Sequence, residues 1–278
     1  MAGPLVSICI PTYRGAAFLP ATISSVLDQS YADFEIWVID DASPDQTAEV
    51  VRAFRDERIH YVRNEHNLGP NGNWNRCLEL ARGKYYKLLP QDDLLEPDSL
   101  AEHVAILEAD VDQQIALVFG TRLVIDHRDR PYFNRGLRRS RAGPIEGSTL
   151  IRQCVRAGTN LVGEPGNGLI RRLVTERVGP YDAQHPYLVD LDYWFRVLKH
   201  GDGYYTARRS SRFRLSQGSW SVALGLQQYQ DFRGFVERFA ADPALGISRV
   251  DKMLGFAKAR VNMFARALLY RSLFKGKS

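Results

Sequence analysis

The sequence predicts an α/β protein whose N-terminal third forms a parallel sheet. Short apolar runs rich in β-branched residues alternate there with segments of helical periodicity, the pattern of right-handed βαβ units. Neither an internal repeat nor a low-complexity linker interrupts the 278 residues, so one continuous domain is expected. Ligands of such sheets bind at the carboxyl ends of the strands, and the residues that follow each strand are therefore the first candidates for a functional site.

Four strands are expected in the first ninety residues, at 6–11, 34–40, 59–63 and 85–89. Helices are expected between them. The helix after the second strand has the sequence of a capping box, with Ser43 as N-cap, Pro44 at the first helical position and Gln46 at the third. A further helix is expected at 73–81, before the strand that ends at the PQDD segment.

The remainder of the chain is less regular. The polar stretch from Arg122 to Arg141 holds seven arginines and two aspartates. A loop is expected from the end of a strand at 115–125 as far as Gly147. This loop is either solvated or a flap over an anionic donor or a lipid-phosphate acceptor. The other expected elements are strands at 115–125, 166–171 and 211–216 and helices at 148–157, 190–200, 222–240 and 249–274.

Composition excludes several classes of protein. A chain with 45% hydrophobic residues and a net charge of +5 is too apolar and too weakly charged to be disordered. No apolar run approaches the roughly 18–20 residues of a membrane-spanning helix. Residues 249–278 hold eight of the 37 basic and one of the 32 acidic residues, so the tail carries +7 and residues 1–248 carry −2. Because a nucleic-acid-binding protein is expected to spread Lys and Arg over a face of its main fold, nucleic acid is not an expected partner.

Paired aspartates end the predicted strands. One pair, 40–41, follows the second strand, another, 92–93, follows the fourth, and Asp190 with Asp192 forms a third set. Neighbouring carboxylates repel each other, and a cation or polar ligand offsets this cost. Since no His or Cys cluster would suit zinc, the expected cation is Mn²⁺ or Mg²⁺. The alternative for each pair is a solvated loop or a helix cap.

Three segments resemble a known family, the family 2 glycosyltransferases. They read VSICIPTYRGAAFLPATISSVLDQSYADFEIWVIDDASPDQT, NEHNLGPNGNWNRCLELARGKYYKLLPQDDLLEPDSL and VGPYDAQHPYLVDLDYWFRVLKHG. The resemblance implies the GT-A fold, an α/β architecture in which a Rossmann-like nucleotide-binding half continues into a mixed central sheet flanked by helices. The implied boundaries are a GT-A domain at 1–248, divided into nucleotide-binding (5–110) and acceptor-binding (111–221) parts, and a C-terminal helix at 249–278.

The resemblance also implies how the donor is held. Pro11, Thr12 and Tyr13, with the adjoining Arg14, match the loop that lies against the nucleotide base, where Tyr13 offers a ring for stacking. Asp41 matches the carboxylate that accepts a hydrogen bond from the base. A pocket of Tyr and Asp suits uracil or thymine, so a UDP- or dTDP-sugar is the expected nucleoside-diphosphate donor.

On the reaction side, QDD matches the family's DXD-type motif. Asp92 would contact ribose or sugar, and Asp93 would hold the Mn²⁺ or Mg²⁺ that bridges the diphosphate. Asp190 matches the catalytic base, the second residue of an ED pair whose first position is here Val189. A metal stabilises the leaving diphosphate, and a single base activates the acceptor hydroxyl. An inverting glycosyltransferase acting on a glycan or lipid-linked acceptor is therefore expected.

Several positions keep two interpretations. Arg214 belongs to an R-x-H motif whose His is replaced by Ser216, and it either meets the diphosphate or is a solvated strand charge. Asn67 either binds the nucleotide or serves a turn and helix N-cap. Glu164 is either structural or bonds an acceptor sugar, and Trp194 either packs in the core or lines the acceptor cleft. Glu164 and His185 are also competing candidates for the base.

The C-terminal helix has apolar residues near helical spacing, interleaved with Lys and Arg. It is either a helix that lies on an anionic membrane surface or one that packs on the domain with a cationic outer side. Three widely spaced cysteines and an N-terminus without a basic leader predict a cytoplasmic protein, with the helix as a peripheral contact to the inner face of the plasma membrane.

Two other functions compete with the transferase. A protein that binds sugar nucleotides without turnover is suggested by Val189 and Ser216 alone. A Rossmann dehydrogenase is disfavoured, because the first turn reads PTYRGAAF and contains no G-x-G-x-x-G.

Overall fold

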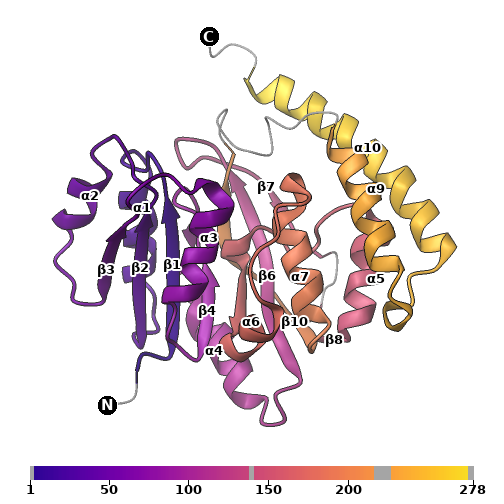
Figure 1. The fold of residues 1–278 in the computed structure, drawn as a ribbon, viewed down its shortest axis with the longest axis horizontal. Coiled ribbons are helices and arrows are strands. Elements are labelled where there is room, and N and C mark those ends of the chain that lie inside the picture. The colour runs from indigo at the N-terminus through magenta and orange to yellow at the C-terminus, as the bar shows by residue number, and fades with distance from the viewer. Residues whose placement is uncertain (1–2, 138–140, 216–226, 275–278) are drawn as a thin grey trace.

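A mixed ten-stranded sheet runs through the molecule in the order β3-β2-β1-β4-β9-β6-β10-β5, with β7 paired to β6 and β8 to β10 (Figure 1). The structure is a computed structural model that describes residues 3–137, 141–215 and 227–274. Its strands are β1 Val6–Thr12, β2 Phe34–Asp40, β3 Ile59–Arg63, β4 Tyr85–Leu88, β5 Leu94–Leu95, β6 Ile115–Ile125, β7 Pro131–Arg135, β8 Gly143–Ile145, β9 Gly168–Arg171 and β10 Asp202–Arg214.

The N-terminal part of the sheet is parallel, as predicted. Strands β3, β2, β1 and β4 are neighbours, and every residue of β1 and β2 is buried because helices cover both faces. Register pairs Thr12 with Asp40 at the carboxyl ends of β1 and β2. The loops that carry the predicted nucleotide-binding residues therefore start side by side.

The C-terminal part makes the sheet mixed. Strand β9 is antiparallel to both β4 and β6, whereas β10 is parallel to β6 and antiparallel to the short β5. Because β5 follows the QDD segment directly, its pairing with β10 brings the end of β10 to that segment. Sequence positions more than a hundred residues apart thus meet at one edge.

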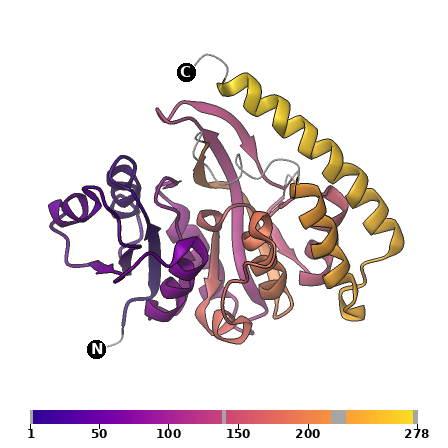
Figure 2. The same ribbon diagram turned by 45° about the horizontal axis from the view of Figure 1, so that its top comes forward.

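Helices on the two faces of the sheet enclose two cores. One core lies under α1, α2 and α4, and the other under α3, α5, α6, α7, α9 and α10. Figure 2 shows α9 and α10 together on the side of the molecule away from β3. The helices are α1 Leu19–Leu27, α2 Thr47–Ala53, α3 Gly69–Leu80, α4 Ser99–Ala109, α5 Gly147–Ala157, α6 Arg172–Val178, α7 Val189–Leu198, α9 Gln227–Ala240 and α10 Arg249–Phe274, with 3₁₀ turns at Pro165–Asn167, Pro186–Leu188 and Pro243–Leu245.

The capping box predicted at Ser43 is wrong. Helix α2 begins only at Thr47, and its N-cap, Gln46, makes no side-chain capping bond, while Asp45 accepts hydrogen bonds from the backbone N–H and the hydroxyl of Thr47. The Ser43 hydroxyl instead accepts a 2.9 Å bond from the backbone N–H of Arg14. A tertiary contact to the neighbouring loop has taken the place of the local cap.

The prediction of a loop between the strand at 115–125 and Gly147 is also wrong in part. Strand β7 returns along β6, and β8 pairs with β10. These short edge strands have mainly exposed residues in β7 and lack the apolar pattern that marks a buried strand. The predicted strand at 211–216 is the end of a longer one, β10, and the start of the helix predicted at 222–240 lies outside the described residues.

Helix α10 has the predicted bounds. It packs on α5 and α9, and Ala259 and Met263 are buried against the domain. Among the described helices, we find none that combines the length and apolar character required to cross a lipid bilayer.

Candidate active site

The loop after β1 is tied to the QDD segment. Gln91 accepts hydrogen bonds from the Thr12 hydroxyl and, at 2.9 Å, from the Tyr13 N–H, and its side-chain amide donates a 3.0 Å bond to the Tyr13 carbonyl. Pro11 and Thr12 are buried, while the Tyr13 side chain is 40% exposed and the Arg14 guanidinium lies 5.3 Å from its ring centre. The exposed ring is therefore held at the strand ends by the hydrogen bonds of its own backbone to Gln91.

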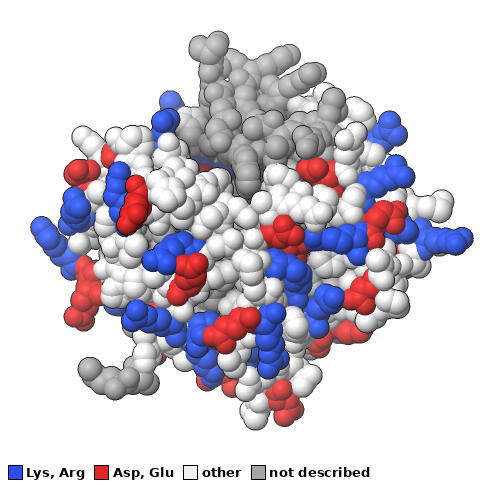
Figure 3. Space-filling model, in the orientation of Figure 1, with Lys and Arg blue, Asp and Glu red and all other residues white. Residues whose placement is uncertain are grey.

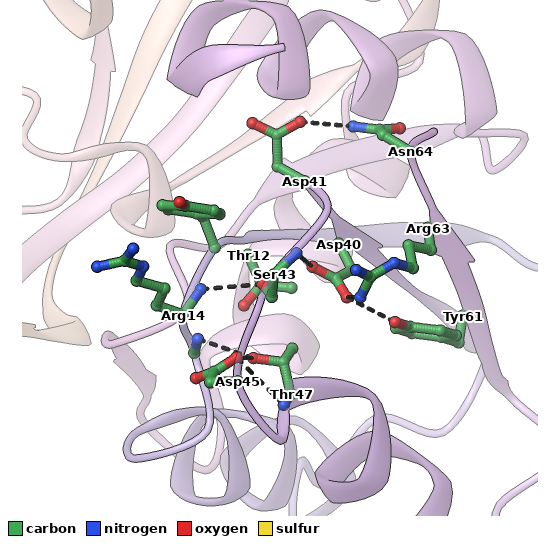
Figure 4. Close-up of polar contacts among 12 residues, drawn as sticks. Thr12, Arg14, Asp40, Asp41, Ser43, Asp45, Thr47, Tyr61, Arg63 and Asn64 are labelled. Atoms are coloured by element: carbon green, nitrogen blue, oxygen red, sulfur yellow. Dashed lines mark hydrogen bonds and ion pairs between the residues drawn. The ribbon is translucent and has the colours of Figure 1, made fainter. Parts of the chain in front are cut away.

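The two aspartates after β2 lie in different surroundings (Figure 4). Asp40 is fully buried, and it accepts bonds from the Ser43 N–H at 2.9 Å, the Tyr61 hydroxyl at 2.6 Å and Arg63 at 3.1 Å. Those contacts cross-link the strand ends, so Asp40 is structural.

Asp41 turns toward α3 instead. Its Oδ1 accepts 2.8 Å bonds from the Asn64 amide and from the backbone N–H of Leu68. Both bonds reach the same oxygen, which orients the carboxylate. Asn67 supports this turn: its amide donates a 3.1 Å bond to the Asp41 carbonyl, and its Oδ1 accepts the Gly69 N–H at 3.0 Å. These contacts are those of a turn at the start of α3.

Asp92 and Asp93 lie at the carboxyl end of β4. Asp93 is buried, and its Oδ1 accepts a 2.9 Å bond from the backbone N–H of Arg214 at the end of β10. Burial raises the pKa of both carboxyl groups, and repulsion by Asp92 raises that of Asp93 further. A buried pair of this kind gains stability from a bound cation.

Arg214 holds the chain around this pair. Its side chain is buried, donates a 2.8 Å bond to the Asp92 carbonyl and a 2.9 Å bond to the Asp126 carbonyl, and forms a 2.7 Å ion pair with Asp129. It is therefore neither solvated nor without partners. Ser216, which replaces the His of the R-x-H motif, lies outside the described residues.

One pocket, with a volume of about 240 Å³, brings the predicted reaction residues together. Asp92 and Asp93 from the first half of the chain line it together with Glu164, Asp190 and Arg214 from the second half. Its far wall comes from helices α9 and α10. The sequence places these residues up to 122 positions apart, and the antiparallel β9 joins the two halves.

Asp190 lies in the first turn of α7, facing this pocket. Its Oδ2 accepts a 2.9 Å bond from the Asn160 amide, and its Oδ1 accepts the Leu191 N–H at 2.7 Å. Burial and the negative charge of Glu164 raise the pKa of Asp190 to about 6. A carboxylate with a pKa near neutrality is ionised at pH 7 and is basic enough to accept a proton from a hydroxyl group.

Two arginines hold Glu164 in the pocket wall. The fully buried Arg122 forms an ion pair with it, and Arg135 on β7 lies 3.4 Å away. Burial alone would raise the pKa of Glu164, but these two positive charges outweigh it and lower the pKa. Glu164 is therefore an anion beside Asp190 rather than a competing proton acceptor.

Other candidates lie outside the pocket. Trp194 is 2% exposed, and its indole N–H donates a 2.7 Å bond to the Gly163 carbonyl, which supports the loop carrying Glu164. Asp192 is buried and pairs with Arg196 and Arg238 on the far side of α7. His185 packs edge-on against Phe235 and does not line the pocket.

Sequence reasoning missed three residues that organise the site. Gln91 joins the two donor loops, Asn160 holds Asp190, and Arg122 pairs with Glu164. Gln91 stands beside the DXD-type pair and could have been found from that motif. Nothing local marks Asn160 or Arg122, because their partners lie about 30 to 40 residues away in the sequence.

The residues present fit a divalent cation. Among the described residues, no three His, Cys, Asp or Glu side chains cluster into a complete ligand set. A cation that is shared with phosphate oxygens needs only one or two carboxylates, as is usual for Mg²⁺. Asp93, with its raised pKa and its neighbour Asp92, meets that requirement.

The fold and this pocket define the class of protein, a GT-A protein with its acids at the strand ends. The profile described as "Glycosyl transferase family 2" matches residues 7–179, more than half of the chain. The chain belongs to glycosyl transferase family 2.

Two relatives are similar to parts of the chain. The uncharacterized protein MT1568 of Mycobacterium tuberculosis is 32% identical over 71% of this chain, which covers 63% of that protein. The β-1,3-glucosyltransferase WfgD of Escherichia coli, named for UDP-Glc and α-D-GlcNAc-diphosphoundecaprenol, is 34% identical over 44% of this chain and 47% of its own. The chain thus spans less than two thirds of both relatives.

Solved structures share the fold. TarS residues 1–349 of S. aureus, in complex with UDP-GlcNAc, align with a TM-score of 0.67 at 16% identity, over 85% of this chain and 65% of that one. The mannosyltransferase PcManGT of Pyrobaculum calidifontis, in complex with GDP-Man and Mn²⁺, aligns with a TM-score of 0.64 at 18% identity, over 98% and 76%. At these identities the likeness shows the GT-A fold.

Proposed function

We propose that this protein is a divalent-metal-dependent, inverting glycosyltransferase. It would move a sugar from a nucleoside diphosphate to a hydroxyl group of a glycan or glycolipid. The observation that carries the proposal is that Asp190, with a pKa of about 6, lines the same pocket as Asp92 and Asp93. A base and a site for a leaving diphosphate within one pocket suit a single displacement.

The residues divide the reaction between them. Asp190 accepts the proton of the acceptor hydroxyl as its oxygen bonds to the anomeric carbon, while the bond from that carbon to the phosphate oxygen breaks. One displacement inverts the anomeric centre. Asp93 would hold Mn²⁺ or Mg²⁺, which supplies charge stabilisation for the leaving diphosphate, and Asp92 would contact the ribose or the sugar of the donor. Arg214 keeps both carboxylates in place through the Asp92 carbonyl and its own N–H.

On the donor side, we propose that Tyr13 stacks on the base and that Asp41 accepts its ring N–H. The 40% exposure of the Tyr13 side chain and the fixed carboxylate of Asp41 support a uracil or thymine base. Pro11 and Thr12 shape the floor, Asn67 supports the turn, and Arg14 is available to the nucleotide. The structures of TarS and PcManGT are complexes with nucleotide sugars, which agrees with a UDP- or dTDP-sugar here in chemical class.

On the acceptor side, Glu164 would accept a hydrogen bond from an acceptor hydroxyl while Trp194 fixes its loop. The pocket continues past Arg135 and Arg266 into a second cavity lined by apolar side chains from β7 and β10. The two arginines could bind the phosphate, and the apolar side chains of the second cavity could contact the lipid, of an acceptor sugar that is linked through phosphate to a lipid. We also propose a cytoplasmic location.

Calorimetry with UDP, dTDP, GDP and ADP, each with Mn²⁺, with Mg²⁺ or with EDTA, tests the donor site. A uridine or thymidine diphosphate should bind only with metal. Asp93→Ala should abolish this metal-dependent binding, whereas the exposed control Asp112→Ala should retain it. Equal binding with metal and with EDTA in all proteins would remove the metal assignment. Release of nucleoside diphosphate from the bound donor sugar separates an active transferase from a protein that only binds.

A further inference from the structure

Helix α10 is fastened to the domain along one face. Asp251, Gly255, Ala259 and Met263 are buried, and a side chain on Gly255 would overlap the carbonyl of Val155 in α5. Asp251 also forms an ion pair with Arg156. The close approach that Gly255 permits fixes which side of α10 faces the domain and which faces away.

The opposite face is apolar and exposed. Figures 1 and 2 show α10 at the rim of the molecule, with no other element outside it. Met253 is 71% exposed, Val261 66% and Leu268 67%, and these values show that no described segment covers the stripe. The residues of this stripe recur at the three- or four-residue spacing of one helix face. They are Val250, Met253, Leu254, Ala257, Val261, Phe264 and Leu268.

Cations flank this stripe without acidic neighbours from the same helix. Arg249, Lys258 and Arg260 are exposed, and Asp251, the only acid from residue 249 to the C-terminus, is buried in its ion pair. Elsewhere, acidic and basic side chains are interspersed over the face drawn in Figure 3. The residues of α10 itself therefore combine apolar area with positive charge on the outer side, and Glu237 of α9, which lines a cavity with Arg260 and Phe264, forms an ion pair with Lys252.

We propose that the outer stripe of α10 docks on an anionic lipid surface. Its apolar side chains would enter the interface between headgroups and acyl chains, and Arg249, Lys258 and Arg260 would pair with anionic headgroups. A second copy of the chain fits less well, because two such faces in contact would bring positive charges together.

The stripe also runs beside the entrance of the acceptor side. The second cavity shares Arg135 and Arg266 with the active pocket, and Asn262 and Ala265 of α10 line it. Docking would thus place this cavity near the lipid surface, where a lipid-linked acceptor is found. This last step rests on the proposed function, whereas docking itself does not.

Flotation of the full chain with lipid vesicles tests the proposal. The protein should float with vesicles of phosphatidylcholine and phosphatidylglycerol at 70:30 and far less with phosphatidylcholine alone, and high salt should reduce binding. The stripe variant Val261→Asn/Phe264→Asn/Leu268→Asn and the charge variant Lys258→Glu/Arg260→Glu should each lower partitioning at least tenfold. The matched control Val111→Asn/Leu173→Asn changes apolar residues that are 86% and 54% exposed elsewhere, and it should bind like the wild type.

Cooperative unfolding in urea shows that each variant is folded, and calorimetry with the metal-bound nucleoside diphosphate tests the donor site separately. Undiminished flotation of the stripe variant, or no flotation of the wild type, would overturn the proposal. So would a wild-type dimer that the stripe substitutions convert to a monomer in light scattering. Vesicle binding without any nucleotide binding would leave docking supported and count against the proposed function alone.

Discussion

The side-chain amide of Asn160 donates a 2.9 Å hydrogen bond to Oδ2 of Asp190, joining the loop before β9 to the first turn of α7. The same amide donates to the Gly163 carbonyl at 2.8 Å, next to Glu164. The proposed base is thus held by the loop that also carries its anionic neighbour, and its position and its pKa are set together.

Asp190→Asn should abolish transfer but not donor binding. The amide has nearly the same shape and cannot accept the proton of the acceptor hydroxyl, so kcat should fall by about 10²- to 10⁴-fold. Steady-state rates and calorimetry with the nucleoside diphosphate measure the two effects, with the exposed Asp182→Asn as control. A fully active Asp190→Asn protein would exclude this residue as the base.

The pH profile should report the same carboxylate. Since Asp190 must be ionised to accept a proton, kcat/KM should rise with pH through about 6 and then level off. Glu164→Gln removes a negative charge that raises the pKa of Asp190, so the rise should move to lower pH. The exposed Glu176→Gln should leave it in place. If the rise in kcat/KM occurs at the same pH in Glu164→Gln, Glu164 does not raise the pKa of Asp190.

Asp41→Asn should alter which nucleobase the donor site prefers. Because Asn64 and Leu68 both donate to Oδ1, the amide oxygen of Asn would take that position and its NH₂ would face the base. A charged hydrogen bond contributes about 1.5–3 kcal/mol, so UDP affinity should fall roughly 10- to 100-fold. The affinity for CDP, whose ring nitrogen accepts a hydrogen bond, should fall less than that for UDP or should rise.

Asp40→Asn provides the contrast for that experiment. Its carboxylate holds Ser43, Tyr61 and Arg63, so this change should lower the free energy of unfolding and leave the preference for UDP over CDP intact. Urea denaturation and calorimetry distinguish the two variants. Equal selectivity in both would mean that Asp41 does not contact the base.

Lys87 should make stability depend on pH. It is fully buried in β4, it donates bonds of 3.0 and 2.8 Å to the carbonyls of Gly166 and Gly168, and burial lowers its pKa to about 7. In the unfolded chain a lysine titrates near 10.4, as is usual. Between these values the unfolded state binds more protons, so stability should rise with pH by about 1.4 kcal/mol per unit.

Lys87→Met isolates this contribution. In urea denaturation, the free energy of unfolding of the wild type should rise relative to that of Lys87→Met between pH 7.5 and 9.5. Lys84→Met, which removes an exposed ion pair, should show no such trend relative to the wild type. A constant difference between wild type and Lys87→Met across that range would contradict the lowered pKa.

Much of the fold follows from local patterns. The buried strands of the parallel sheet and the bounds of α10 were predicted because apolar periodicity records which faces are covered. Strands β7 and β8 were not, since short edge strands leave little of that pattern. The start of α2 was misplaced because the Ser43 hydroxyl bonds Arg14 across the loop, and no local rule predicts that contact.

The sequence by itself determined the family, the alternation of strands and helices, and the identities of the candidate acids, because motifs and periodicity are written along the chain. Only the tertiary structure decided what each acid does. Asp40 and Asp41 are adjacent in sequence, but Asp40 bonds residues of the neighbouring strand end whereas Asp41 bonds the turn before α3. Burial and the charge of Glu164 raise the pKa of Asp190. Burial and charge act through space, so they become known only when distant segments are brought together.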